Sequence, residues 1–370
     1  MKIELSTLKK SERLSLSLRK LFEQYSYRKF SMNRMEEYSF YAQNINFLSS
    51  KHIITFSDSD GRLMALKPDI TLSIAKTAST HNEKLTKLYY IESVFRLSKE
   101  AGGFNELNQM GLECIGEITP YTVVEVVSLA LKSLWQIGDE EYALDISHQG
   151  LITGLFEGMG INRGDMSVMM RFIAEKNKHD LESFAREKGV SDENTDKLLR
   201  FLSISGDLAN GILELHKISD GNVVMDMAIA EIAMVANAIK SPCLRLQTSL
   251  VSDTDYYNGI LFNGYVSSVP TAVITGGRYD NLLARMGKAD MGGIGFAICF
   301  DAIERYMRSQ IAATVPTYVY YDENVDVARV YSAAEAVTSG GGTACVCTAL
   351  PDDANESNTI DLTSGNGGRR

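Results

Sequence analysis

Two strand-rich stretches separated by a long helical stretch place the strongest constraint on how this chain folds. Residues 52–116 and 244–299 contain short runs rich in β-branched and aromatic residues, and Gly, Asp and Pro separate these runs as turns separate strands. Residues 150–240 contain long amphipathic runs, such as MDMAIAEIAMVANAIK, and few strand signals. We therefore predict one sheet-forming core that is interrupted by a helical insertion.

The predicted fold is α+β, with an antiparallel sheet flanked by helices. Its core comprises residues 1–149 and 241–312, and the insertion comprises residues 150–240. Residues 7–25 place Leu and aromatic side chains at helical spacing, which predicts an amphipathic opening helix. Residues 313–370 predict a truncated α/β segment with a strand in TYVYYDE, a helix in VARVYSAAEAV and a frayed, partly disordered end.

The charge balance argues against a general affinity for nucleic acid. The chain has 370 residues and carries 37 Lys and Arg against 47 Asp and Glu, which gives a net charge of −10. No global positive field therefore attracts RNA, although a local basic groove is compatible with this balance. We predict that the chain does not bind tRNA.

The cysteines and histidines predict neither a disulfide framework nor a metal site. The five cysteines are scattered, mostly in apolar runs, which indicates buried thiols in a reducing compartment. Cys345 and Cys347 are too close for the usual zinc knuckle, and no two histidines are four residues apart. The chain starts without an apolar signal core, and no window approaches the roughly eighteen apolar residues of a membrane helix. We expect a cytoplasmic protein without metal, cofactor or membrane segment.

The segment LKPDIT contains a carboxylate and a hydroxyl two residues apart. On an extended segment Asp69 and Thr71 point to the same side, and together they can receive an ammonium group. The simpler interpretation is that the Asp caps a short helix in TLSIAKTAS.

A second polar cluster follows Phe95 and Arg96 along the chain. Gln109 and Glu113 are four residues apart in a strand-like run, so both face one side, and Gly111 between them leaves space for a ligand. The alternative is a pair of exposed polar residues on a solvated sheet face.

A third cluster combines DYYNG with GGRYD at residues 276–280. Glycines beside aromatic residues permit close approach of backbone and ligand, and the hydroxyls of Tyr256 and Tyr257 can bond a buried polar group. By itself, GGRYD favours a hairpin turn that a pair between Arg278 and Asp280 stabilises.

Taken in order, these segments resemble those of the histidyl-tRNA synthetase family. LKPDITLSIAKT is similar to the family's L-R-P-E-x-T segment, and YYIESVFRLSKEAGGFNELNQMGLECIG is similar to its second class II motif. DYYNGILF resembles the end of the R-G-L-D-Y-Y signature, TGGRYDNLL resembles the G-G-R-Y-D signature, and GIGFAICFDAIERY resembles the third class II motif. The resemblance covers about residues 10–310 and implies a class II synthetase-like fold.

The resemblance also implies a pocket for free histidine. In the family, the amino acid is held by an acidic residue and a Thr of the first segment, by Gln and Glu of the second motif, and by the Tyr pair. The matching positions are Asp69, Thr71, Gln109, Glu113, Tyr256 and Tyr257. Asp69 is one methylene shorter than the family's Glu.

The departures from the family fall on the residues that handle ATP. Cations must neutralise the charge that develops on the phosphates during adenylation. The family's catalytic Arg corresponds to Ser252, and the terminal Arg of the third motif corresponds to Ala302. Further substituted positions, in the second motif, are Ser98, Gly103 and Asn105. Arg96 remains as a candidate phosphate contact.

A family member that keeps the amino-acid pocket and loses the ATP machinery resembles the regulatory subunits of short-form ATP phosphoribosyltransferase. That resemblance implies a non-catalytic histidine sensor, required for activity and feedback inhibition in the first step of histidine biosynthesis, with the catalytic subunit as partner. It also implies a homodimer within a hetero-oligomer, although Asn33 replaces the proline that is usual in the first class II motif. The alternatives are an active histidyl-tRNA synthetase, which Ser252 and Ala302 disfavour, and another synthetase-like paralogue.

Overall fold

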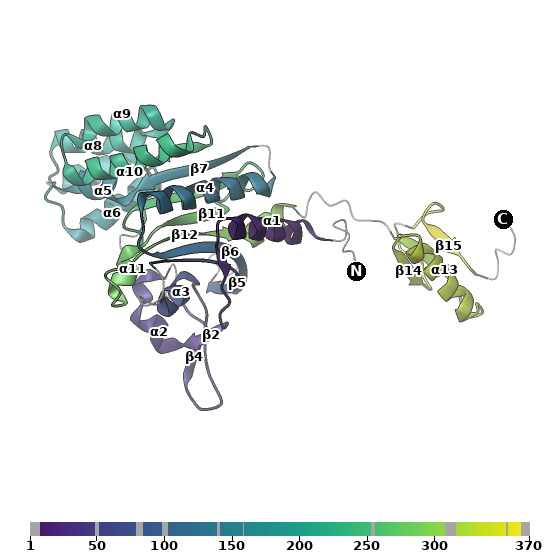
Figure 1. The fold of residues 1–370 in the computed structure, drawn as a ribbon. Coiled ribbons are helices and arrows are strands. Elements are labelled where there is room, and N and C mark those ends of the chain that lie inside the picture. The colour runs from purple at the N-terminus through teal and green to yellow at the C-terminus, as the bar shows by residue number, and fades with distance from the viewer. Residues whose placement is uncertain are drawn as a thin grey trace. The chain divides into compact units, whose positions relative to one another are not determined.

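The computed structural model divides the chain into two compact units, residues 1–307 and 308–370. The parts that it describes are residues 8–48, 52–78, 84–97, 103–138, 141–157, 159–252, 256–307, 316–352 and 354–363. The larger unit contains a wide sheet with helices packed against it (Figure 1).

The larger unit is built on a nine-stranded sheet with the order β1-β5-β6-β12-β11-β10-β7-β9-β8. In that order the strands are β1 (Arg28–Lys29), β5 (Leu85–Leu97), β6 (Phe104–Gly116), β12 (Gly292–Cys299), β11 (Ile274–Arg278), β10 (Ile260–Val266), β7 (Tyr142–His148), β9 (Leu244–Gln247) and β8 (Ser205–Gly206). The six strands from β5 to β7 pair antiparallel, as predicted. Two pairs near the ends, β1 with β5 and β7 with β9, are parallel.

Helix α1 (Lys10–Gln24) is the predicted opening helix, and it packs beside α4 (Pro120–Ile137). Its apolar stripe includes Leu18 and Phe22, both fully buried. The ends of α4 are set by its sequence, because the Thr119 hydroxyl accepts a bond from the backbone of Thr122 and Gly138 adopts a left-handed conformation.

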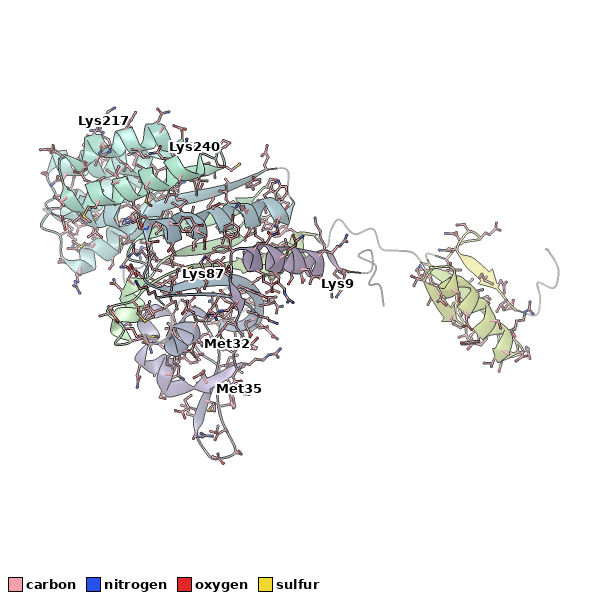
Figure 2. All side chains as sticks on the ribbon, viewed as in Figure 1. Lys9, Met32, Met35, Lys87, Lys217 and Lys240 are labelled. Atoms are coloured by element: carbon pink, nitrogen blue, oxygen red, sulfur yellow. The ribbon has the colours of Figure 1, made fainter. Side chains whose placement is uncertain are left out.

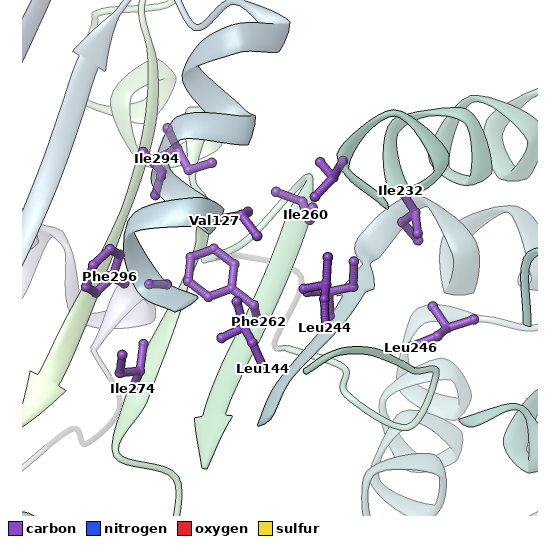
Figure 3. Close-up of a cluster of buried hydrophobic side chains, with 14 of the residues drawn as sticks. Val127, Leu144, Ile232, Leu244, Leu246, Ile260, Phe262, Ile274, Ile294 and Phe296 are labelled. Carbon is purple, nitrogen blue, oxygen red and sulfur yellow. The ribbon is translucent and has the colours of Figure 1, made fainter. Parts of the chain in front are cut away.

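The main hydrophobic core lies between the sheet and these helices. The rings of Phe262 and Phe296, from β10 and β12, lie 6.2 Å apart, and both residues belong to the same buried cluster as Val127 of α4 (Figure 3). On β10, Gly264 leaves room for this helix, since a Cβ there would lie 2.9 Å from the side chain of Leu134. Burial of large apolar side chains of this kind contributes roughly 1.5–3 kcal/mol each.

Residues 149–239 form the helices α5 (Gln149–Phe156), α6 (Arg163–Ala174), α7 (Lys178–Glu187), α8 (Asp192–Ser203), α9 (Leu208–Ser219) and α10 (Val223–Ile239). Polar side chains cap the start of the last five, namely Asn162, Asn177, Ser191, Asp207 and Asn222. The run that includes residues 166–189 is broken into α6 and α7 at Lys176, which has a φ of 54°. These helices share the main core with the sheet, and charged residues such as Lys217 and Lys240 lie on their outer surface (Figure 2).

The opposite side of the sheet carries a second, smaller core. It is formed around β2 (Met35–Glu37), α2 (Tyr38–Gln43), the short 3-10 helix η2 (Ile45–Phe47), β3 (Thr55–Ser57), β4 (Leu63–Leu66), α3 (Thr71–Thr77) and α11 (Asp280–Arg285). Buried members such as Ile70, Tyr90 and Tyr279 join α3, the sheet and the start of α11. Helix α12 (Phe300–Met307) follows β12 directly.

The smaller unit contains a parallel sheet with the order β14-β13-β15. Its elements are β13 (Thr317–Tyr320), α13 (Val327–Ser339), β14 (Ala344–Cys347) and β15 (Thr359–Asp361). The predicted strand and helix correspond to β13 and α13, and Val319, Val330 and Leu362 form the core. The predicted frayed end, residues 364–370, lies outside the described residues.

The cysteines are less buried than their sequence context predicts. The expectation of buried thiols is right for Cys114 but wrong for Cys345, which is exposed, because an edge strand such as β14 leaves side chains uncovered. The other three cysteines are partly buried.

Within the parts of the chain that are described, no helix is both long enough and apolar enough to span a bilayer.

Candidate functional site

A cavity of about 360 Å³ lies between the sheet and the smaller core. It brings together all seven residues that the sequence singled out: Asp69, Thr71, Arg96, Gln109, Glu113, Tyr256 and Tyr257. They come from the loop before α3, from α3 itself, from β5 and β6, and from the segment before β10. Their roles in binding remain a prediction, but their proximity is a property of the fold.

Glu113 lies at the centre of the polar lining and is 2% exposed. One of its carboxylate oxygens accepts a hydrogen bond of 2.6 Å from the hydroxyl of Thr71, and the other accepts a bond of 2.6 Å from Tyr279. Burial raises the pKa of this carboxyl to about 8, although both hydrogen bonds lower it. Gly295 on the neighbouring strand makes room for it, since a Cβ there would lie 1.8 Å from the carboxylate.

Asp69 both caps α3 and lines the cavity. One oxygen accepts a bond of 2.9 Å from the backbone N–H of Leu72, so the helix-cap interpretation is correct. The other oxygen lies 3.4 Å from Nη2 of Arg96, whose Nε donates to the carbonyl of Pro68 at 2.9 Å. Burial raises the pKa of Asp69, and the Arg96 charge opposes this effect.

Gly111 does not have the role that the sequence predicts. Gln109 and Glu113 do line the same cavity, as their spacing in β6 predicts. The glycine between them does not open space for a ligand, because a Cβ there would lie 2.4 Å from the hydroxyl of Tyr90 and 2.3 Å from the carbonyl of Phe296. It admits the buried Tyr90 ring instead, and that ring itself lines the cavity.

Three further tyrosines, Tyr256, Tyr257 and Tyr279, line the cavity. The rings of Tyr256 and Tyr257 meet edge to face with centroids 4.6 Å apart, and Tyr279 lies 6.2 Å from the first of them. Burial raises the pKa of all three phenols, so they remain neutral hydrogen-bond donors near neutral pH. The sequence prediction did not include Tyr279, although GGRYD marked its position.

The hairpin-turn interpretation of GGRYD is wrong. Its first three residues end β11, and Tyr279 leads directly into α11. The backbone therefore passes from strand to helix, which places the tyrosine over the cavity. The expected pair between Arg278 and Asp280 is present at 2.8 Å, and Arg278 also lies 3.8 Å from Glu231 of α10.

The described part of the site contains few positive charges. Ser252 lines the cavity, whereas Ala302 lies in α12 and Asn105 is exposed in β6. Gly103 precedes β6, and Ser98 lies outside the described residues. Among the described residues that line the cavity, Arg96 is the one cationic side chain. Its predicted phosphate contact stays a prediction.

Comparison with known proteins places the chain in a family. The sequence matches the model of the histidyl-tRNA synthetase family over residues 3–303. The ATP phosphoribosyltransferase regulatory subunit of Caldanaerobacter subterraneus subsp. tengcongensis is 27% identical over 336 residues, which cover 87% of this chain and 86% of that protein.

Solved structures show the same fold. An ATP phosphoribosyltransferase regulatory subunit/histidyl-tRNA synthetase from Bacillus halodurans superposes with a TM-score of 0.74 at 22% identity, covering 98% of this chain and 95% of that one. A chain of the ATP phosphoribosyl transferase complex from Thermotoga maritima gives a TM-score of 0.61 at 17% identity. This match covers 78% of the present chain and 96% of the other.

The chain belongs to the histidyl-tRNA synthetase family. Within that family, its resemblance to ATP phosphoribosyltransferase regulatory subunits is confirmed by curated relatives that carry this name. The predicted class II synthetase-like fold is confirmed as well.

Proposed function

We propose that this chain is the non-catalytic, histidine-sensing regulatory subunit of a short-form ATP phosphoribosyltransferase. The observation that carries the proposal is the composition of the cavity. Its acidic, amide and tyrosine groups match those expected for histidine, while one described cation, Arg96, lines it. Such a cavity suits an amino acid better than a nucleoside triphosphate, because buried phosphates require paired positive charges.

In this proposal the two ends of histidine meet different walls. Asp69 and the hydroxyl oxygen of Thr71 receive the ammonium group. Glu113 accepts the imidazole N–H, and the phenols of Tyr256 and Tyr257 close the aromatic side. The raised pKa of Glu113 is consistent with this role, because burial disfavours the charged carboxylate and a donor from the ligand would favour it.

The partner in this proposal is the catalytic subunit, and the chain acts as a homodimer within a larger assembly. The relatives that are named regulatory subunits and the structural likeness to a chain of the Thermotoga maritima complex support the catalytic partner, whereas the homodimer follows from the family resemblance alone. For histidine to inhibit a catalytic site on another chain, binding must favour one state of the assembly. A coupling of about 1–3 kcal/mol changes affinity several-fold to a hundredfold.

The test compares Glu113→Ala with the parent in a reconstituted complex. We expect catalysis without histidine to be unchanged and inhibition to require at least about tenfold more histidine, because a charged hydrogen bond contributes roughly 1.5–3 kcal/mol. The measurement is phosphoribosyl-ATP formation over a histidine titration, with the melting temperature followed in parallel.

A matched control is Glu106→Ala, which removes an exposed carboxylate from the same strand. It should leave both catalysis and inhibition unchanged. If the Glu113→Ala complex is inhibited at the parent's histidine concentration, the pocket assignment is wrong. If it loses complex formation and thermal stability together, Glu113 supports the sheet and does not sense the ligand.

A further inference from the structure

We infer that Arg96 is a positioning residue that orients the carboxylate of Asp69 toward the ligand's amine, and that it contacts neither a phosphate nor the ligand's own carboxylate. This inference rests on the proposed function, since it names the part of histidine that this wall of the cavity recognises. It also separates the role of Arg96 from the phosphate contact that the sequence motif predicts.

The contacts of Arg96 join it to two adjacent residues of the loop before α3. Its Nε donates to the carbonyl of Pro68 at 2.9 Å, and its Nη2 lies 3.4 Å from the carboxylate of Asp69. The Arg side chain is 27% exposed and the Asp side chain is 14% exposed, so solvent screens this ion pair only in part. The planar guanidinium is therefore fixed against the loop by two bonds in different directions.

The carboxylate of Asp69 is held from both sides. Its second oxygen accepts the N–H of Leu72 in the first turn of α3. A carboxylate has about four acceptor positions, so two bonds to the protein leave capacity for an ammonium group. Because Asp is one methylene shorter than Glu, its reach depends on its orientation, which Arg96 and the helix backbone together set.

The surroundings of Asp69 explain why a cation is needed beside it. The groups that interact with it from neighbouring elements are acidic or phenolic: Tyr41, Tyr90, Glu113, Tyr256 and Tyr257. Burial raises the pKa of Asp69, and Arg96 is the main group that lowers it. Without Arg96 the carboxyl would retain its proton more readily and would attract an amine less strongly.

The test uses Arg96→Met with three probes that differ in one group. These are histidine, imidazolepropionate, which lacks the amine, and histamine, which lacks the carboxylate. We expect the variant to bind histidine and histamine about tenfold or more weakly and to bind imidazolepropionate within about twofold of the parent. The amine's contribution, measured as the affinity ratio of histidine to imidazolepropionate, should therefore fall toward one. Calorimetry measures the affinity for histidine directly, and displacement of bound histidine measures the affinities for the other two probes.

Two further variants separate positioning from a structural role. Arg96→Lys keeps a positive charge beside Asp69 and should recover part of the ratio. In an Asp69→Asn background, Arg96→Met should add little further loss of histidine affinity, because both changes then act on one interaction. A folding defect would instead lower the melting temperature and weaken all three probes equally.

The opposite selectivity would overturn the inference. If the variant binds imidazolepropionate and histidine more weakly but binds histamine as the parent does, Arg96 contacts the ligand's carboxylate. The inference is also overturned if Arg96→Met weakens the binding of all three probes equally. It is overturned as well if the parent's affinity ratio of histidine to imidazolepropionate is near one. Failure of the parent to bind histidine at all would instead overturn the proposed function, and this outcome is visible before any variant is made.

Discussion

At the scale of single residues, Glu113 shows how a binding site can oppose stability. The pKa of its carboxyl is 4.5 in an unperturbed chain and about 8 in the folded protein, because burial penalises the charged form. Between these values the folded state holds a proton that the unfolded state has released. The free energy of unfolding therefore falls as pH rises through this window.

We predict that Glu113→Gln changes this pH dependence. The neutral amide keeps the shape of the side chain and removes the titration. The unfolding free energy of the variant relative to the parent should therefore be greater at pH 8.5 than at pH 6, by on the order of a few kcal/mol. Urea unfolding at both pH values, without histidine, measures the difference. An identical difference between the two proteins at both pH values would show that the carboxyl does not titrate in this range.

At the scale of elements, α3 is fixed at both ends. Asp69 bonds to its first turn, and at its last turn the ammonium of Lys288 donates to the carbonyls of Ala75 at 2.5 Å, Lys76 at 3.1 Å and Ala78. Burial lowers the pKa of this lysine. The ammonium satisfies carbonyls that a helix end leaves without partners and complements the helix dipole.

We predict that Lys288→Met loosens α3 and the site together. Loss of these bonds should cost about 1–3 kcal/mol of unfolding free energy and should weaken histidine binding, because Thr71 is in this helix and Asp69 caps it. Denaturant unfolding and calorimetry measure the two effects. Lys20→Met, which removes an exposed lysine from α1, is the control and should change neither. Unchanged stability in Lys288→Met would show that α3 is held by its apolar face alone.

At the scale of the whole molecule, the fold positions a ligand cavity but does not by itself provide the positive charges that adenylation requires. The class II framework positions the cavity, and the motif resemblance predicts that Ser252 and Ala302 stand where the family has arginines that neutralise phosphate charge. Each missing charged hydrogen bond removes roughly 1.5–3 kcal/mol of transition-state stabilisation. We therefore expect that the framework alone does not supply adenylation.

We predict that histidine-dependent pyrophosphate exchange is absent. Ser252→Arg combined with Ala302→Arg should also fail to restore it, because Ser98, Gly103 and Asn105 remain unsuited to ATP. The assay follows exchange against a control without protein, beside an active histidyl-tRNA synthetase in the same buffer. Exchange by the parent above this control would contradict the prediction. Exchange by the double variant alone would mean that the two arginines suffice.

The sequence by itself predicted many of the helices and strands and seven of the residues that line the cavity. Period-two and helical patterns are local, so they located strands such as β5 and β6, the opening helix and the helices of residues 150–240. The six predicted ligand residues followed from the order of the motifs, and the fold brings them into one cavity. The boundaries of the insertion as a separate domain stay a prediction.

Only the tertiary structure decided how those residues are connected. Tyr279 bonds to Glu113 across 166 positions of sequence, and Arg96 reaches Asp69 across 27. The same holds for Gly111, whose missing side chain accommodates Tyr90 from the neighbouring strand. Propensity and spacing report on neighbours along the chain, whereas these contacts depend on strand pairing and on the packing of α3 and α11 against the sheet.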